Sequence, residues 1–506
     1  MLDRQCARAL IMHPQDDVGL VLSALKPGDR LIDTDVVASE EIAAGHKIAL
    51  RDIDNGALIR KYGAAIGKAT QKIARGAHVH LHNVSADIAA NVGDGASKSA
   101  TRLAPREAFF NGYLRANGAV GTRNYIGIVS TVNCSATVAR RIAEAFPDDL
   151  FADEEGVDGV VAFTHTTGCG TPSQGEGVDN LTRTLGGYLR HPNFAGIVLI
   201  GLGCEVNQVE RVLREQALET GARLRAFTIQ DVGGTAKAIA HGKALVKELL
   251  EIARPMRRAP VSAAHLTLGL QCGGSDGWSG VTANPALGVA ADILVACGGT
   301  AILSETPEIY GAEPLLFARA VDTDVRAALQ ERLDWWRDYA ARHGAELNNN
   351  PSPGNLKGGL TTILEKSLGA VAKSGSSPLM GVYRYGEPIT RKGFVFMDSP
   401  GYDPCSATGQ TAAGANILAF TTGRGSVFGS KPAPCIKLAS NEAMARHMDD
   451  DMDIDCSPVL AGAALADLGE AIFQKLLAIA SGEKSKSEAL GIGDHEFVPW
   501  QLGAVM

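Results

Sequence analysis

The feature that most constrains the fold of this chain is an alternation of short apolar runs with helix-like segments. It extends from Gly112 to about Pro260. Each run is followed by a loop and then by a segment in which apolar residues recur at helical spacing. Strands that are separated by helices do not pair as hairpins, so this alternation predicts a parallel sheet with helices on its faces. The predicted strands are Ile126–Thr131, Gly159–Thr164, Ile197–Gly201 and Leu224–Ile229.

The same alternation returns after a basic, proline-bearing joint at 253–260, which we interpret as a domain boundary. Long loops rich in Gly, Pro and Asn separate the later segments, and loops of this kind often carry functional residues. A second parallel α/β unit is therefore expected, with strands near Leu266–Leu270, Gly393–Met397, Ile417–Thr421 and Cys435–Leu438.

The beginning of the chain has a different character. Its short β-rich runs are interrupted by turn signals such as Lys26–Asp29 and Arg75–Gly76, which predicts a small β domain. A following stretch rich in Ala, Ser, Gly and Asp is typical of a linker. We therefore expect a β domain at 1–84, a linker at 85–111, an α/β middle domain at 112–258 and a C-terminal α/β domain at 259–506.

Composition narrows the class of protein. A chain of 506 residues is too long for one hydrophobic core, which agrees with a division into domains. A net charge of −8 without a basic stripe argues against a nucleic-acid partner. The N-terminus lacks the pattern of a signal peptide, and no apolar run reaches the roughly 18 residues needed to cross a membrane. We expect a cytoplasmic protein whose nine cysteines are reduced thiols, metal ligands or core residues.

Four of the cysteines follow predicted strands: Cys134, Cys169, Cys204 and Cys272. Open parallel sheets bind ligands beyond the carboxyl ends of their strands, so these thiols could converge on one point. Thiolates with a nearby histidine or carboxylate suit iron, zinc or an iron–sulfur cluster. None of the four has the compact spacing of a known ligand pair, and a free cysteine is often a small core residue. The spacing leaves both interpretations open.

The histidines occur in two settings. His165 ends one of the predicted strands, where a rigid backbone suits a general acid or base. At the end of the β domain, strand-like alternation places His78, His80 and His82 on one face. Three imidazoles on one face can bind a metal, but the pattern favours a solvated strand face.

Two glycine-rich loops contain a basic residue. Lys357 lies in the loop Asn350–Thr362, and Arg424 follows a predicted strand in the loop Thr421–Ser426. Both suit the capture of a carboxylate by backbone N–H groups, a helix N-terminus and a cation. Neither loop contains the phosphate-binding pattern GxxxxGK[ST], and no complete GxGxxG follows a strand, so nucleotide binding has little support.

Several long motifs, spread over nearly the whole chain, resemble the altronate/galactarate dehydratase family. The ending HVHLHN of the β domain and the stretch Glu205–Val209 resemble altronate more than galactarate dehydratases. The other matching stretches are His13–Val18, Gly45–Leu50, Lys61–Gly67, Arg115–Asn124, His165–Cys169, Gly201–Glu205, Cys272–Asp276, Thr282–Pro285, Ser304–Glu305, Asn350–Gly359 and Thr422–Gly425.

This resemblance implies an N-terminal β-clip domain of the SAF type, a linker and two α/β segments, of which the second is Rossmann-like. It implies a hydro-lyase that converts a sugar acid, an altronate-like aldonate or a galactarate-like aldarate, to a 2-keto-3-deoxy acid. It further implies dependence on Fe²⁺ or Mn²⁺, with an iron–sulfur cluster as the lesser alternative. The implied assembly is a homodimer, with the middle domain as its dimerisation domain.

The matched motifs also suggest roles for single residues. We expect His165, Lys357 and His46 to take part in proton transfer. In relatives a Lys tends to follow the Asn directly, whereas Leu356 separates Asn355 from Lys357 here, which leaves the role of Lys357 open. The expected substrate-binding residues are His13, Arg123, Asn124, Asn284, Asn355 and Arg424, and the expected metal ligands are Cys134, Cys169, Cys204, Cys272 and Glu205.

Two other functions fit the same features. The first is a sulfo-lyase acting on a sulfolactate-like acid, because some relatives resemble such enzymes. The second is a sugar-acid-binding protein without catalytic activity, although the lack of a helix-turn-helix or basic segment counts against a transcriptional role. An assay for the keto acid product separates these functions.

Overall fold

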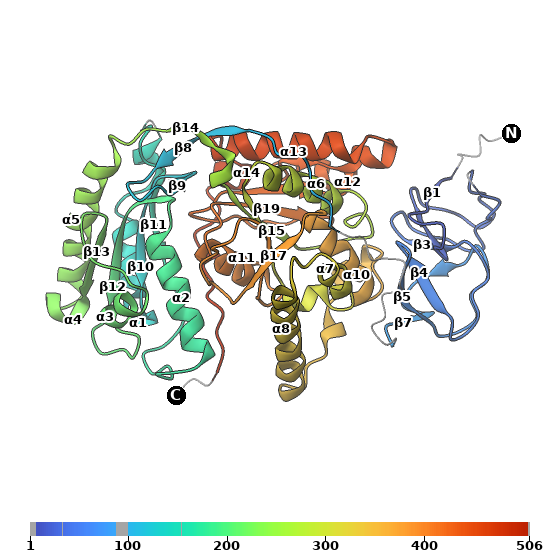
Figure 1. The fold of residues 1–506 in the computed structure, drawn as a ribbon, viewed down its shortest axis with the longest axis horizontal. Coiled ribbons are helices and arrows are strands. Elements are labelled where there is room, and N and C mark those ends of the chain that lie inside the picture. Colours follow the sequence, from blue (N-terminus) through green and yellow to red (C-terminus); the bar gives the residue numbers. More distant parts are fainter. Residues whose placement is uncertain (1–6, 33, 88–99, 153, 504–506) are drawn as a thin grey trace.

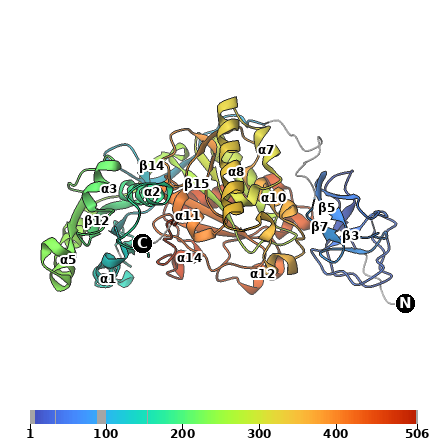
Figure 2. The same ribbon diagram turned by 90° about the horizontal axis from the view of Figure 1, so that it is seen from below.

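The protein consists of three units in a row, seen in a computed structural model that describes residues 7–32, 34–87, 100–152 and 154–503. Two perpendicular views place the C-terminal unit between the N-terminal β domain and the middle domain (Figures 1 and 2). The order of the units in space therefore differs from their order along the chain. Among the described residues, no helix is long and apolar enough to span a bilayer.

The N-terminal unit is the expected small β domain. One antiparallel sheet has the order β1-β2-β3-β6, and a second has the order β4-β5-β7. Alternating residues such as Val18, Ile48, Ile59, Ile66 and Val79 turn inward and form its buried core. The strands are β1 (Ala9–Leu10), β2 (Val18–Val21), β3 (Lys47–Ala49), β4 (Leu58–Lys61), β5 (Ala64–Ala69), β6 (His78–Val79) and β7 (Val84–Ser85).

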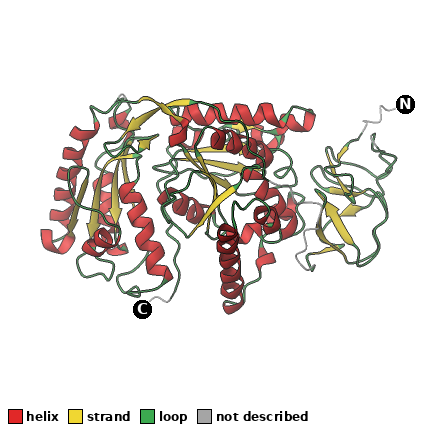
Figure 3. Cartoon of the chain, in the orientation of Figure 1, coloured by secondary structure: helices red, strands yellow, loops and turns green. Residues whose placement is uncertain are grey.

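The middle domain is built on the predicted parallel sheet. Its order is β11-β10-β12-β13, and the strands are buried on both faces because helices cover both sides (Figure 3). The strands are β10 (Tyr125–Ser130), β11 (Gly159–Phe163), β12 (Phe194–Gly201) and β13 (Leu224–Thr228). The helices are α1 (Asn133–Ala143), α2 (Glu176–Arg190), α3 (Val209–Glu215), α4 (Ile229–Val232) and α5 (Thr235–Ala253).

A small antiparallel sheet joins the middle and C-terminal domains. It pairs the strand that enters the middle domain, β8 (Phe109–Leu114), with the strand that leaves it, β14 (Ala259–Ser262), and β9 (Val120–Gly121) lies on the other side of β8. Part of the predicted linker, residues 88–99, lies outside the described residues. The described part packs against the C-terminal domain, where the Arg106 N–H donates to the Ala296 carbonyl.

The C-terminal domain contains a seven-stranded parallel sheet of order β17-β18-β16-β15-β19-β20-β21. On one side of β15 lie β16, β18 and the edge strand β17, and on the other side lie β19, β20 and β21. The direction of the chain across the sheet therefore reverses beside β15, which is where sheets of this kind form a crevice at the carboxyl ends of their strands. The strands are β15 (Thr267–Cys272), β16 (Thr300–Leu303), β17 (Leu379–Tyr383), β18 (Gly393–Met397), β19 (Ile417–Thr422), β20 (Cys435–Ala439) and β21 (Ile454–Asp455).

Helices cover both faces of this sheet. On one face α6 and α13 pack on Leu268, Leu270 and Ile436, and on the other α11 contributes Cys405 and Ala407 to a core around Phe420. The helices are α6 (Ala283–Ala296), α7 (Glu313–Phe317), α8 (Thr323–Arg342), α9 (Pro353–Lys357), α10 (Ile363–Val371), α11 (Asp403–Ala412), α12 (Glu442–His447), α13 (Leu465–Ala480) and α14 (Lys486–Ala489).

Candidate functional site

A cavity of about 550 Å³ opens at the carboxyl edge of the seven-stranded sheet. Cys272 at the end of β15, Glu308 after β16 and Asp403 after β18 contribute to its wall, and Asn350 and Asn355 line it from the α9 region. A concave site at strand ends is where sheets of this topology bind small molecules.

Ionisable side chains are concentrated at this wall. The Lys373 ammonium donates to Cys272 Sγ at 2.8 Å and lies 3.5 Å from the Glu305 carboxylate. The Lys366 ammonium donates to Glu308 Oε1 at 2.6 Å. All five side chains are buried, although buried charged residues are rare unless they are paired. We call Cys272, Glu305, Glu308, Lys366 and Lys373 the carboxylate cluster.

The cluster shifts the pKa values of its two carboxyl groups in opposite directions. Burial and the neighbouring Glu308 raise the pKa of Glu305 well above its ordinary value. Burial alone would also raise the pKa of Glu308, but Lys366 and Lys373 hold it below its ordinary value. Burial and Glu308 raise the pKa of Asp403 to about 6. Such a separation of pKa values among neighbouring carboxyl groups is typical of catalytic sites.

The backbone at Glu305 is strained. Its φ is 69°, in the left-handed region that residues other than glycine seldom adopt. The Glu305 N–H donates to Ser399 Oγ, and the Thr306 hydroxyl donates to Asp398, so contacts on both residues hold this conformation. Strain of this kind persists where the surroundings impose it, which is frequent at functional sites.

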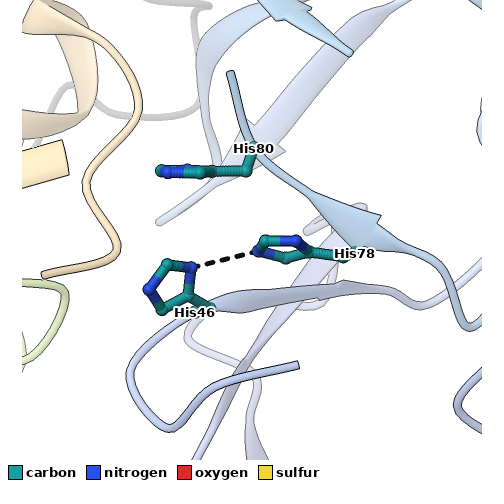
Figure 4. A group of neighbouring side chains, drawn as sticks. All are labelled: His46, His78 and His80. Atoms are coloured by element: carbon teal, nitrogen blue, oxygen red, sulfur yellow. Dashed lines mark hydrogen bonds between the residues drawn. The ribbon is translucent and has the colours of Figure 1, made fainter. Parts of the chain in front are cut away.

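A cluster of three histidines lies on the β domain (Figure 4). His46 precedes β3, His78 begins β6, and His80 follows it. Their ring centroids are 5.0 to 5.4 Å apart, and His46 Nδ1 lies 3.0 Å from His78 Nε2. We call His46, His78 and His80 the histidine cluster.

The imidazoles of this cluster are neutral at pH 7. Burial, followed by the neighbouring His46, lowers the pKa of His78 to about 4. Burial and the Lys47 charge lower the pKa of His80 to about 3. The prediction of a solvated face is wrong for both rings, which are half-buried, and His80 also contacts Thr361 of the C-terminal domain. His82 is exposed, as predicted.

Two helices of the C-terminal domain connect the β domain with the cavity. The carbonyl of Lys357, at the end of α9, is 3.3 Å from His46 Nε2, whereas Asn355 of the same helix lines the cavity. On α10, Glu365 accepts from the buried Lys47 and Lys61 of the β domain at 2.9 and 2.8 Å. The next residue, Lys366, contacts Glu308 of the carboxylate cluster.

Several predicted site residues lie in this region. His46 belongs to the histidine cluster, and Asn355 and Cys272 line the cavity. The Arg424 side chain is exposed and passes close to Gly358, since a Cβ there would lie 3.3 Å from Arg424 Cδ. Lys357 contributes its carbonyl oxygen, and its side chain is exposed.

Other predicted site residues serve the packing of the protein. His13 packs against the turn at Gly63 of the β domain. Arg123 is buried and donates to Glu488 at 2.6 Å. Asn124 donates to the carbonyl of Gly156. Asn284 donates to the Gly369 carbonyl and accepts from Thr421. The structure brings neither Arg123 nor Asn124 to the cavity.

His165 is buried at the end of β11, and both of its ring nitrogens contact backbone. Nε2 lies 3.1 Å from the Ser130 carbonyl, and Nδ1 accepts from the Thr167 N–H at 3.2 Å. Burial lowers its pKa to about 4. The ring therefore ties the loop after β11 to the end of β10, and in this conformation it has no nitrogen available for a substrate.

The expected convergence of four thiols is wrong. Three of the thiols, Cys134, Cys169 and Cys204, follow strands of the middle domain and are exposed. Cys272 is buried at the carboxyl end of β15, in the sheet of the C-terminal domain. Strands of two separate sheets do not share one carboxyl edge. Glu205 accepts from Thr131 and from two backbone N–H groups, so its carboxylate orders the loop that carries Cys204.

Sequence reasoning missed most of the carboxylate cluster. Glu305 occurs in a matched motif, but no pattern assigned it a role. The available signal was the pair Glu365–Lys366 and the later Lys373 in an otherwise apolar helical stretch. Charges at buried positions of a helix point to partners elsewhere in the fold.

Family comparisons match all three units. The model described as altronate/galactarate dehydratase SAF domain matches residues 7–87. The model for the second domain of D-galactarate dehydratase/altronate hydrolase matches residues 112–254. The model for the C-terminal part of D-galactarate/altronate dehydratase matches residues 263–505.

Similar proteins include two dehydratases. The chain is 36% identical to altronate dehydratase of Bacillus subtilis over 438 residues, which cover 85% of this chain and 86% of the relative. It is 37% identical to galactarate dehydratase (L-threo-forming) of Escherichia coli over 488 residues, 94% of this chain and 92% of the relative.

A third relative consists of two subunits. The (2R)-sulfolactate sulfo-lyase of Chromohalobacter salexigens has a beta subunit that is 33% identical over 397 residues, 78% of this chain and 97% of that subunit. Its alpha subunit is 37% identical over 84 residues, 15% of this chain and 89% of that subunit.

Proposed function

The chain belongs to the altronate/galactarate dehydratase family, and on this premise we propose that it dehydrates a sugar acid to a 2-keto-3-deoxy acid. The observation that carries the proposal is the match of all three domains, together with a cavity whose wall contains two carboxyl groups of different pKa, Glu308 and Asp403. The substrate class is an altronate-like aldonate or a galactarate-like aldarate.

The reaction requires a base for the proton at C2 and an acid for the hydroxyl that leaves from C3. Glu308 lines the cavity and is ionised, so we assign it the role of the base. Asp403 also lines the cavity, and its pKa of about 6 lets it carry a proton near neutral pH, so we assign it the acid. Glu308 takes the C2 proton, the C3–O bond breaks, and the hydroxyl leaves as water with the Asp403 proton. The enol product then becomes the keto acid.

We propose that a divalent ion, Fe²⁺ or Mn²⁺, assists this reaction. When bound, such an ion stabilises the negative charge that develops beside the substrate carboxylate. The protein's own part is to hold the base and to keep its charge. Lys366, which donates to Glu308, and Asn350, which donates to the same oxygen at 2.8 Å, fix the orientation of that carboxylate.

An anaerobic activity screen tests the function. Chelator-treated protein is supplied with Fe²⁺, Mn²⁺, Mg²⁺ or no metal and offered a panel of aldonates and aldarates, and the keto acid is measured. We expect turnover of at least one sugar acid with Fe²⁺ or Mn²⁺ and little without metal. Full activity in metal-free protein would show that the reaction does not depend on a metal ion. Tight binding of a sugar acid without keto acid would favour a binding protein instead.

A second candidate is a sulfo-lyase, because both subunits of the sulfolactate sulfo-lyase match this chain. Including 3-sulfolactate in the screen, with sulfite as the measured product, separates the two reactions. We prefer dehydration to the sulfo-lyase reaction because each dehydratase aligns with a larger share of this chain than either sulfo-lyase subunit does. We also propose that the protein acts as a cytoplasmic homodimer, with the resemblance to the family as the support.

A further inference from the structure

Among the described residues, two groups of side chains bring metal-binding atoms within 4.8 Å of one another. One is the histidine cluster, and the other consists of Cys272, Glu305 and Glu308. A divalent ion needs donor atoms that are free of protons and not already neutralised by other cations. This requirement distinguishes the two groups.

The group around Cys272 already contains two bound cations. The Lys373 ammonium is 2.8 Å from Cys272 Sγ, and the Lys366 ammonium is 2.6 Å from Glu308. A metal ion at the centre of this group would lie beside both ammonium groups, and its repulsion with them would be strong in a buried site. The carboxylate cluster therefore suits proton transfer better than metal binding.

The histidine cluster has the opposite character. Its rings are half-buried, and none of the three histidines forms an ion pair with a carboxylate in the described structure. His46 Nδ1 and His78 Nε2 are 3.0 Å apart and share a hydrogen bond, whose proton an ion would replace. Two ligands at right angles, each roughly 2.1 Å from an ion, lie about 3.0 Å apart, so this spacing fits two neighbouring positions of an octahedral site.

Contacts outside the cluster fix which ring nitrogens face inward. His46 Nε2 lies 3.3 Å from the Lys357 carbonyl, which can only accept, so Nε2 carries the proton and Nδ1 presents a lone pair. His80 Nδ1 lies 3.3 Å from Thr361 Oγ1, which leaves Nε2 for an ion. Ligating histidines usually donate their second nitrogen to a carbonyl or hydroxyl in this way. Both partners belong to the C-terminal domain, so the cluster is completed only when the β domain is docked.

We propose that His46, His78 and His80 bind one divalent metal ion of the Fe²⁺ class. Imidazole donors suit iron, and three protein ligands leave positions open for oxygen atoms of a substrate. Asn355 lines the cavity, and Lys357 of the same helix contacts His46, so α9 connects the histidine cluster to the wall of the cavity. The identity of the ion and its use in dehydration rest on the proposed function, but the ligand set does not.

Titration of the metal-free, full-length protein with Co²⁺, a spectroscopic substitute for Fe²⁺, tests the ligand set. We expect one Co²⁺ per chain, with visible absorption and no thiolate-to-cobalt band in the near ultraviolet. His78→Ala and His80→Asn should each weaken binding by more than about 100-fold. Thr361→Val, which removes only the outer partner of His80, should weaken it by roughly 10-fold, since outer partners typically contribute 10- to 100-fold.

Two variants serve as matched controls. His82→Ala removes an exposed imidazole whose ring centroid is 5.5 Å from that of His78, and Cys272→Ser changes the competing group. Both should bind Co²⁺ like the wild type, and circular dichroism establishes that every variant is folded. Equal Co²⁺ affinity in the wild type, His78→Ala and His80→Asn would overturn the proposal, and so would a thiolate-to-cobalt band that disappears in Cys272→Ser.

The titration separates this inference from the proposed function because it needs no substrate. Loss of Co²⁺ binding in the histidine variants supports the ligand set even if no sugar acid is turned over. Conversely, keto acid formation by a His78→Ala protein that still binds metal like the wild type would leave the dehydratase proposal intact and overturn the ligand set.

Discussion

The replacement Glu365→Gln tests how the β domain is held in place. The Glu365 carboxylate is fully buried between the Lys47 and Lys61 ammonium groups. Burial alone would raise its pKa, but the two lysines lower it from the ordinary 4.5 to about 2. A difference of this size corresponds to about 3 kcal/mol of stability, because each tenfold change in proton affinity is worth about 1.36 kcal/mol. Removing one partner of a buried ion pair is also expected to cost about 3–5 kcal/mol.

The variant should therefore unfold in urea with a stability about 3 kcal/mol lower at pH 7. The folded pKa of Glu365 lies below its unfolded value, so the stabilisation is present above about pH 4.5 and is lost as the pH falls toward 2. The difference between wild type and variant should shrink over that window. Hydrogen–deuterium exchange of Lys47–Ala49 should be faster in the variant at neutral pH, because this strand packs at the contact.

Glu470→Gln is the matched control. Glu470 pairs with Arg106 at 2.8 Å, but their side chains are 40% and 38% exposed. Exposed ion pairs contribute less than about 1 kcal/mol to the stability of the folded state. If Glu365→Gln destabilised the protein no more than Glu470→Gln, the buried network would not hold the domains together. An unchanged difference between wild type and Glu365→Gln from pH 5 to pH 2.5 would also contradict the assigned charge.

Three further substitutions test the site. Glu308→Gln removes the proposed base and should lower kcat by about 10²–10⁴-fold without changing the circular dichroism spectrum, whereas Glu470→Gln should leave kcat unchanged. If Asp403 is the acid, kcat should fall as the pH rises above about 6, and Asp403→Asn should abolish this alkaline limb; an unchanged limb assigns the acid elsewhere. His165→Asn should lower the melting temperature with little effect on kcat, because both ring nitrogens hold backbone. A hundredfold loss of kcat in a stable His165→Asn protein would restore its role in proton transfer.

The two parallel sheets could be predicted because their strands are apolar along their full length. β12 is buried at every position from Phe194 to Gly201, so its sequence shows a continuous apolar run that helices must cover on both faces. The ends of such strands also predicted that Cys272 lies at the carboxyl end of its strand, where the cavity opens.

The contacts between domains could not be predicted in the same way. Glu365 meets Lys47 and Lys61 across 318 and 304 positions of sequence, and no local pattern reports such a partner. The alternation of the histidines predicted a shared strand face. It did not reveal that His46 joins them from a preceding turn, or that Thr361 contacts the face.

Motif resemblance also failed to separate residues of the site from residues of the core. Arg123 and Asn124 occur in a long matched motif, yet the first is paired with Glu488 and the second with backbone. A motif is retained for packing as readily as for chemistry. Only the burial and the partners of a side chain distinguish the two.

The contact between the β domain and α10 has a consequence for how the gene can be arranged. Lys47 and Lys61 of the β domain and Glu365 of α10 are buried together at the boundary between the two domains. Lys47 also donates to the Gly359 carbonyl at 2.6 Å. An interface with buried charges of opposite sign on its two sides selects its partner without help from a covalent connection, so two open reading frames can encode what is one polypeptide here. The sulfolactate sulfo-lyase is made as two subunits, and its alpha subunit aligns with 84 residues of this chain, about the length of the β domain.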